Sequence, residues 1–264
     1  MFIKYSNLIG IFDSGIGGTS IWKEINKLLP QENTLYLADA LNAPYGEKPK
    51  DEILKLSIKN TEFLLQKGCK IIVVACNTAT TNAISYLREH YNVPFIGIEP
   101  AIKPAAIKTK TNNIGILATQ GTLSSQLFSK TSDTISKNIT IHEQNGDGLV
   151  HLIEKGAINS IKTQELLTKY LKPLLSKNID CLVLGCTHYP YLIPQIRKIV
   201  SPKVNIIDSG FAVAKQLKSV LETENLLNTT NKESQHQFYI NTDERVLKSF
   251  LKEEKNCEVG YLDF

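Results

Sequence analysis

The sequence predicts an α/β protein built from two pseudo-symmetric domains with mostly parallel sheets. Three observations lead to this fold class. Short β-branched runs alternate with helical patterns from start to end, which is typical of parallel α/β sheets. Residues 71–75 form a continuous apolar strand, as expected where helices cover both faces of a sheet. The second half of the chain also repeats landmarks of the first half.

The first half contains four predicted strands joined by helical segments. We expect a strand at residues 8–12, then a glycine-rich turn at 13–18 and a helix capped by Thr19 or Ser20, whose apolar residues recur on one helical face. The next elements are a strand at 34–37, a helix at 53–65, the strand at 71–75, a helix from about residue 80 to 90 and a strand at 94–98.

Three landmarks recur in the second half in the same order. The matching pairs are Gly10 with Gly115, residues 72–77 with 182–187, and residues 94–98 with 204–207, at offsets of 105 to 110. Apolar strands recur in any α/β chain, but here Cys76 and Cys186 also end corresponding strands. The pattern therefore predicts a duplicated unit of 105–110 residues.

The remaining segment is too small to fold alone. Its expected elements are a helix at 212–221, a polar linker at 225–233, a strand at 237–240 and a helix at 243–252. One strand does not make a stable sheet, so this segment is predicted to pack back onto the first unit. The predicted domains are residues 1–99 plus 210–264, and residues 100–209.

Composition excludes several classes of protein. With 42% hydrophobic and 21% charged residues among 264, the chain has the composition of a globular protein, and no apolar run approaches the ~18 residues of a membrane helix. The N-terminus lacks the apolar core and cleavage site of a signal peptide. The net charge of +4 comes mostly from scattered lysines, which argues against a nucleic-acid partner. Five cysteines, an odd number, argue against a disulfide framework.

Polar or thiol residues follow four of the predicted strands. Because ligands of open parallel sheets bind at the carboxyl ends of the strands, we expect the active site there, in the cleft between the two domains. The residues at these ends are Asp13-Ser14-Gly15, Cys76-Asn77-Thr78, Ala118-Thr119 and Cys186-Thr187-His188. One thiol at a strand end is most often a buried small hydrophobe, but Cys76 and Cys186 at matching positions favour a functional pair.

Two opposed thiols suit racemisation at a carbon next to a carboxylate. That reaction needs a base on one face and an acid on the other, and the two exchange roles in the reverse direction. A thiol has a pKa of about 8.5, so its neighbours can make either protonation state accessible near neutral pH. Asp13 is the candidate neighbour of Cys76, unless it only forms the turn. His188 lies on the same side of an extended backbone as Cys186, unless it is a surface histidine.

No motif indicates a cofactor or a metal. The turn at 13–18 departs from Gly-x-Gly-x-x-Gly, because Ser20 stands where the last glycine belongs, and no lysine follows as in a Walker loop. Its free amides at a helix N-terminus still favour an anion such as a substrate carboxylate. Tyr45-Gly46 offers another exposed turn of amides. The absence of a Cys-x-x-Cys pair and the dispersed histidines argue against zinc. The other thiols are expected to be structural or incidental: Cys69, Cys181 and Cys257.

Four motifs in register resemble one known family. They are Gly10-Ile11-Phe12-Asp13-Ser14-Gly15-Ile16-Gly17-Gly18, Ala43-Pro44-Tyr45-Gly46, Ala75-Cys76-Asn77-Thr78-Ala79-Thr80 and Leu184-Gly185-Cys186-Thr187-His188-Tyr189-Pro190, and Ile207-Asp208-Ser209-Gly210 fits as well. From about residue 8 to the C-terminus, the chain resembles glutamate racemases, cofactor-independent members of the aspartate/glutamate racemase superfamily.

The resemblance implies roles for residues at the matching positions. Cys76 and Cys186 would be the acid/base pair, with Cys76 serving D-glutamate and Cys186 serving L-glutamate. Glu154 resembles an acidic residue that assists the second cysteine, although Gly146-Asp147 replaces the Cys-Pro of many relatives. The expected substrate contacts are Asp13, Ser14, Tyr45, Gly46, Asn77, Thr78, Thr119, Thr187 and His188. The resemblance also implies a cytoplasmic homodimer, without a cofactor, that makes D-glutamate for peptidoglycan synthesis.

Three other functions stay open on the sequence. A racemase of aspartate or another acidic amino acid uses the same chemistry, and one methylene gives only ~1–3 kcal/mol of discrimination. A thiol hydrolase using Cys186 with His188 leaves Cys76 unexplained. A non-catalytic protein that binds an acidic ligand predicts that replacing either cysteine changes neither ligand affinity nor activity.

Overall fold

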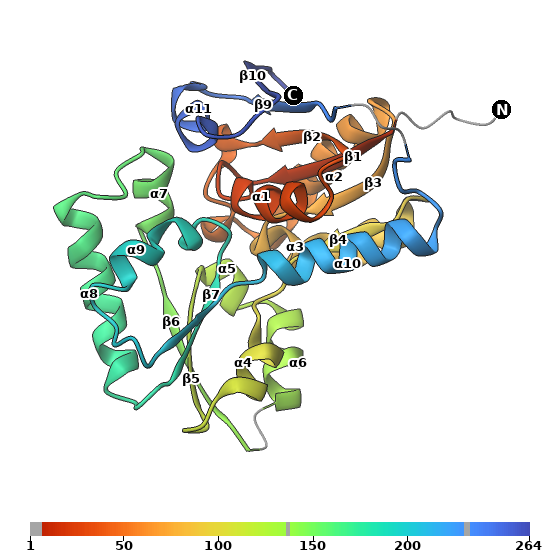
Figure 1. Cartoon of the computed structure of the whole chain (residues 1–264). Helices are drawn as coiled ribbons and strands as arrows, with labels where there is room; N and C mark the ends of the chain where they lie inside the picture. The colour runs from red at the N-terminus through yellow and green to blue at the C-terminus, as the bar shows by residue number, and fades with distance from the viewer. Residues whose placement is uncertain (1–6, 136–137, 230–232) are drawn as a thin grey trace.

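Two parallel sheets form the framework of the protein (Figure 1). The computed structural model describes residues 7–135, 138–229 and 233–264. The first sheet has the strand order β10-β9-β2-β1-β3-β4 and the second has the order β6-β5-β7-β8. Every strand pair among these residues is parallel. The predicted α/β class, with two sets of parallel strands, is confirmed.

We call each sheet with its helices a unit. The first sheet contains β1 (Leu8–Asp13), β2 (Asn33–Ala38), β3 (Cys69–Val74), β4 (Phe95–Gly97), β9 (His236–Ile240) and β10 (Cys257–Tyr261). Its helices are α1 (Thr19–Leu28), α2 (Lys50–Gln66), α3 (Asn77–His90), α10 (Gly210–Thr223) and α11 (Arg245–Leu251), with short 3₁₀ turns η1 (Ala40–Asn42) and η2 (Tyr45–Glu47). The second sheet contains β5 (Asn113–Ala118), β6 (Thr140–Asn145), β7 (Cys181–Gly185) and β8 (Asn205–Ile207). Its helices are α4 (Ile102–Lys108), α5 (Gln120–Leu123), α6 (Gln126–Ile135), α7 (Leu149–Glu154), α8 (Ile161–Leu175), η3 (Tyr189–Leu192) and α9 (Ile193–Ile196).

The two units share one topology. Strands β2-β1-β3-β4 of the first sheet follow the same order as β6-β5-β7-β8 of the second. The equivalent strands β1 and β5 begin 105 residues apart, at Leu8 and Asn113. This arrangement agrees with the repeat that the sequence predicts.

Helices cover both faces of each sheet, because the central strands are apolar on both sides. On β1, Ile9 and Ile11 pack in a core with α1 and α10, whereas Phe12 packs in a second core with α2 and α3. On β5, Ile114 and Ile116 pack in a third core with α4 and α6. Figure 1 shows α10 lying along the first unit although it follows the last strand of the second.

The C-terminal segment adds two strands to the first sheet, not the single strand predicted. Strand β9 pairs with β2, and β10 pairs with β9 at the edge. Cys257 therefore begins a strand instead of lying in a polar tail. Part of the predicted linker, residues 230–232, lies outside the described residues. The division into residues 1–99 plus 210–264 and residues 100–209 stays a prediction.

Two helices next to the strand ends begin earlier than predicted. Helix α3 begins at Asn77 with Cys76 as its N-cap, instead of near Thr80. Helix α1 begins at Thr19, so Gly18 is its N-cap and the predicted capping residues lie in its first turn. The shift of α3 places Cys76, at the end of β3, on a helix N-terminus.

The chain crosses between the two units twice. One connection joins β4 to α4 and the other joins β8 to α10. Ser209 Oγ on the second connection donates a hydrogen bond to Glu99 O on the first, at 2.5 Å. The two connections therefore lie side by side and are joined by a hydrogen bond.

A buried ion pair fastens the segment after α10 to the first sheet. Lys70 Nζ on β3 lies 2.6 Å from Glu32 Oε2, and only 2% of each side chain is exposed. Lys70 also donates to Leu226 O at 2.6 Å, and Glu32 Oε1 accepts a hydrogen bond from the Asn228 N–H at 2.7 Å. Each charge thus keeps its second hydrogen bond only while this segment stays in place.

We expect Lys70→Met to lower the free energy of unfolding by about 3–5 kcal/mol, because the Glu32 carboxylate is left buried without its partner. Lys218→Met is the matched control, since Lys218 and Glu222 form an exposed pair on α10 worth only about 0.3–0.5 kcal/mol. Urea unfolding at pH 7 measures both variants. Equal losses in the two variants would contradict this role of the buried pair.

Candidate active site

The carboxyl ends of β3 and β7 place Cys76 and Cys186 in one buried site between the units. The two residues are 5% and 7% exposed. The side chains are close enough that the charge of Cys186 contributes to raising the pKa of the Cys76 thiol. One thiol from each unit therefore lies near the other, and their action on opposite faces of a substrate stays a prediction.

Cys76 sits where β3 turns into α3. Its Sγ accepts a hydrogen bond from the Ala79 N–H at 3.4 Å and donates one to Ser14 Oγ at 3.6 Å. Burial, followed by the negative charge of Asp13, raises the pKa of the Cys76 thiol well above its ordinary value, although both hydrogen bonds lower it. The Cys76 side chain therefore carries its proton at neutral pH.

Cys186 is the first member of a chain of polar contacts. Its Sγ lies 3.7 Å from His188 Nδ1, and His188 Nε2 lies 2.5 Å from Glu154 Oε1. Burial lowers the pKa of His188, but the hydrogen bonds to Cys186 and Glu154 and the charge of Glu154 outweigh burial and raise it well above 6.5. His188 adopts helical backbone, with φ −75° and ψ −32°, so the extended-strand argument used to place it was wrong even though the two side chains meet.

The glycine-rich turn before α1 binds side chains of the protein itself. The sequence predicts free amides there, and the structure corrects this, because carboxylates from both units occupy them. Gly15 and Gly18 N–H donate to Asp13 Oδ2 at 3.3 and 2.9 Å, Ile16 N–H donates to Glu154 Oε1 at 2.8 Å, and Gly17 N lies 3.3 Å from His188 Nε2. The turn thus fixes the acidic groups on both sides of the site.

Asp13 connects the two units at the centre of the site. Its side chain is fully buried, and Thr187 Oγ1 from the second unit donates to Asp13 Oδ1 at 3.3 Å. Burial raises the pKa of Asp13 from 3.8 to about 6, although the nearby charge of His188 and the Gly18 N–H lower it. Asp13 is thus ionised at pH 7 and protonated in mild acid.

This raised pKa predicts a pH-dependent change in stability. The folded protein binds a proton at Asp13 between pH 3.8 and about 6 that the unfolded chain does not bind. The free energy of unfolding should therefore fall by about 3 kcal/mol as the pH rises through that range. Relative to wild type, Asp13→Asn should gain stability over the same range. Urea unfolding of both proteins from pH 4 to 8 tests this, and a constant difference between them would rule it out.

The turn at Tyr45 and Gly46 packs against the second unit. Tyr45 is only 1% exposed, contrary to the exposed turn predicted, and its hydroxyl donates to Asp39 Oδ2 at 2.5 Å. A Cβ at Gly46 would lie 2.7 Å from Thr119 Cβ, so the Gly46 backbone packs closely against the Thr119 side chain of the second unit. The Tyr45 hydroxyl is therefore occupied inside the first unit.

Between the two units, beside this turn, lie polar side chains that bond only to one another or to no described residue. Three threonine hydroxyls bond to one another, with Thr78–Thr119 at 2.9 Å, Thr119–Thr122 at 3.1 Å and Thr78–Thr122 at 3.3 Å. Both amide atoms of Asn77 are buried with no hydrogen-bond partner in the described part of the chain. Such groups are available to a bound ligand. Thr122 was not predicted, although it lies one helical turn after Thr119.

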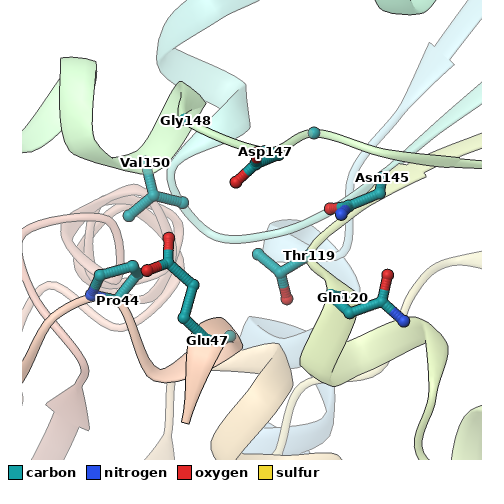
Figure 2. Close-up of a pocket in the computed structure, with 10 residues that line it drawn as sticks. Pro44, Glu47, Thr119, Gln120, Asn145, Asp147, Gly148 and Val150 are labelled. Atoms are coloured by element: carbon teal, nitrogen blue, oxygen red, sulfur yellow. The ribbon is translucent and has the colours of Figure 1, made fainter.

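A small pocket opens between the units next to the threonine cluster (Figure 2). Figure 2 shows Pro44 and Glu47 on one side, facing Thr119, Asn145 and Val150 across it. The full lining is Pro44, Gly46, Glu47, Thr119, Gln120, Asn145, Gly146, Asp147, Gly148 and Val150. Because Thr119 belongs to both, the pocket borders the buried site.

Neither a metal cluster nor a membrane-spanning helix is found in the described ranges. These ranges contain no group of three or more histidine, cysteine or acidic side chains arranged to hold a metal ion. They also contain no helix whose length and apolar character would let it cross a membrane.

Known proteins share both the sequence and the fold. The Asp/Glu/Hydantoin racemase family matches residues 9–217. A glutamate racemase from Herpetosiphon aurantiacus is 44% identical over 220 residues, which cover 83% of this chain and 87% of that protein. A glutamate racemase structure from Bacillus anthracis is 30% identical, with a TM-score of 0.88 and 98% of each chain covered. One from Francisella tularensis, in complex with D-glutamate, is 31% identical, with a TM-score of 0.83 and 97% of each chain covered. The chain therefore belongs to the Asp/Glu/Hydantoin racemase family, among its glutamate racemases.

Proposed function

We propose that this chain interconverts L-glutamate and D-glutamate by two-base proton transfer at Cα, with Cys76 and Cys186 as the acid/base pair and no cofactor. The single observation that carries the proposal is the pair of buried thiols at matching strand ends of the two units. The D-glutamate bound by the Francisella tularensis relative supports the choice of substrate.

The two sides of the site differ in how they hold a proton. Cys76 keeps its proton because burial and Asp13 disfavour the thiolate. On the other side His188 accepts the proton of Cys186, and Glu154 stabilises the resulting imidazolium at 2.5 Å. One thiol is then an acid and the other a base, as racemisation requires.

In this state the site is prepared for L-glutamate. Cys186 takes the Cα proton on one face, so the Cα–H bond breaks and an S–H bond forms. Cys76 then gives its own proton to the opposite face, which produces D-glutamate and leaves a thiolate at Cys76. That thiolate is the base for D-glutamate in the reverse direction, so the two cysteines exchange roles between the enantiomers.

The polar residues around the thiols would bind the substrate. The Asn77 amide, which has no hydrogen-bond partner among the described residues, can donate to a carboxylate and accept from the substrate ammonium group. The hydroxyls of Thr78 and Thr119 can turn from each other toward a carboxylate oxygen. The proposed substrate contacts are Asp13, Ser14, Tyr45, Gly46, Asn77, Thr78, Thr119, Thr187 and His188.

Proton exchange in D₂O tests the proposed reaction. L-Glutamate and D-glutamate are incubated separately with reduced protein, and deuterium at Cα is followed by NMR while chiral chromatography follows the enantiomer ratio. We expect both enantiomers to exchange and to interconvert. Absence of exchange would sink the proposal. Faster exchange of aspartate would assign the alternative substrate, and hydrolysis of an amide or ester without Cα exchange would favour a thiol hydrolase.

The family resemblance also supports a cellular role. We propose that the chain acts as a cytoplasmic homodimer and supplies D-glutamate for peptidoglycan synthesis. Expression in a bacterium that requires added D-glutamate should remove this requirement, and light scattering of the purified protein should give twice the mass of the 29.5 kDa chain. Growth that still depends on added D-glutamate, or a monomeric mass, would count against the respective point.

A further inference from the structure

Asp39 is a buried carboxylate outside the residues that the sequence places in the site. It follows β2 at the carboxyl edge of the first sheet, and its N–H donates to Asp13 O at 3.1 Å. Its side chain is fully buried. A buried charge is costly unless donors surround it. Four side chains supply them: Asn42 at 2.8 Å, Asn241 at 2.6 Å and Lys59 at 3.4 Å on Oδ1, and the Tyr45 hydroxyl at 2.5 Å on Oδ2.

These donors come from distant parts of the chain. Asn42 and Tyr45 belong to the loop that carries η1 and η2, whereas Asn241 follows β9 in the C-terminal segment. The Asn241 amide makes two contacts here: its Nδ2 donates to Asp39, and its Oδ1 accepts a hydrogen bond from the Leu41 N–H of the loop at 2.9 Å. Asn241 is 5% exposed, so water cannot readily replace either contact. The C-terminal segment is thereby attached to the loop that presents Gly46.

The turn at Gly46 has little freedom to move. Its position is fixed on one side by the Asp39 contacts with Tyr45. On the other side, a Cβ at Gly46 would lie 2.7 Å from Thr119 Cβ, and a Cβ at Gly121 would lie 3.1 Å from the Gly46 Cα. A small displacement of the turn therefore changes the spacing between Gly46 and Thr119, which both line the pocket in Figure 2.

We propose that Asp39 and Asn241 are positioning residues for substrate binding: acting through Tyr45 and the backbone at Leu41, they hold the Tyr45–Gly46 turn at the spacing from Thr119 that glutamate requires. This inference rests on the proposed function, because it takes that turn as a substrate contact. Neither residue touches the thiols, so both act on binding of glutamate and not on the proton transfer itself.

Asn241→Ala tests the proposal, since it removes both contacts of the amide and adds no bulk. The KM for each enantiomer and the Kd for D-glutamate, measured by calorimetry, should rise about tenfold, the effect of losing a hydrogen bond to a charged group. The kcat should stay within about threefold of wild type, because the thiols keep their places. Circular dichroism melting identifies the conditions under which the variant is folded.

Ser234→Ala is the matched control. Ser234 lies before the other end of β9, and its buried hydroxyl contacts His236 Nε2 at 3.2 Å. The Ser234→Ala variant therefore loses a buried hydrogen bond of the same C-terminal segment but no contact with the Tyr45–Gly46 turn. Its KM and Kd should match those of wild type. Equal KM values for Asn241→Ala and Ser234→Ala, or a fall in kcat with unchanged KM, would overturn the proposal.

A double variant asks whether the two contacts act through one carboxylate. Tyr45→Phe removes only the hydroxyl, which is engaged by Asp39 and Asn60 and not open to the substrate, and it keeps the backbone of the turn. If both substitutions release the same turn, the double variant with Asn241→Ala should raise the Kd no more than the larger single change, whereas independent effects would multiply. Multiplying effects would contradict the proposal. Wild-type protein that binds glutamate without Cα exchange would sink the proposed reaction alone, because the Kd comparison does not depend on turnover.

Discussion

Cys186→Ser is expected to lower kcat for the interconversion of L- and D-glutamate by about 10³-fold or more, and Cys76→Ser should do the same, because general acid–base groups contribute ~10²–10⁴-fold. A hydroxyl ionises far less readily than a thiol, so serine cannot replace the thiolate at either position. Among the described residues, no other cysteine hydrogen-bonds to either thiol, and each face of Cα needs its own group. Chiral chromatography measures the loss in both directions.

Cys257→Ser provides the control for the cysteine variants. Cys257 lies on the edge strand β10 and its Sγ donates to Lys255 O, far from the strand ends that form the site. Its racemisation rate should equal that of wild type. Substantial interconversion by Cys76→Ser or Cys186→Ser with a folded chain would exclude the two-thiol mechanism, and loss of activity in Cys257→Ser would point to a general effect of removing thiols.

Gly17→Ala is expected to lower kcat/KM by about 10²-fold or more, because a reacting group displaced by about 1 Å costs that much. A Cβ at Gly17 would lie 2.2 Å from His188 Nδ1 and 2.5 Å from its Cγ. The imidazole is a rigid ring that is 1% exposed, so it must shift away from Cys186 and Glu154. The same overpacking should lower the free energy of unfolding by about 1–3 kcal/mol.

The control for this prediction is another glycine with space around it. A Cβ at Gly260 on β10 would meet its nearest atom, on the Tyr239 ring, at 3.8 Å, which is an ordinary contact. Gly260→Ala should therefore keep wild-type activity and stability. Steady-state kinetics and urea unfolding measure both variants. If Gly17→Ala retains full activity, the close packing of the turn on His188 is not needed for catalysis.

Strands buried on both faces could be predicted from the sequence, whereas the polar edge strands β6 and β10 could not. Strand β3 has six buried residues in a row, and the four after Lys70 are an uninterrupted apolar run. Strand β6, with the sequence T-I-H-E-Q-N, and β10, with C-E-V-G-Y, are edge strands that are partly exposed and contain charged residues. Their composition does not differ from that of a loop, because neighbouring strands and not their own side chains hold them in the sheet.

The site residues also fall into two groups, those that a local rule predicts and those that depend on long-range packing. The rule that ligands bind at strand ends leads to Asp13, Cys76 and Cys186 from sequence alone. The same rule also applies to Asp39, which directly follows β2, although this residue was not among those predicted for the site. The contact of Glu154 with the Ile16 N–H joins residues 138 apart, and Asn241 meets Asp39 across 202 residues. Such contacts depend on how the two units and the C-terminal segment pack, which no local pattern specifies.

The hydrogen bond between Ser209 and Glu99 limits how glutamate can reach the thiols. Cys76 and Cys186 are almost inaccessible, so the units must separate before a substrate enters. A rotation of the units about the line through the two connections would open the site and keep this bond, whereas sliding of one unit past the other would break it. We therefore expect the same opening motion to admit glutamate and to release its enantiomer.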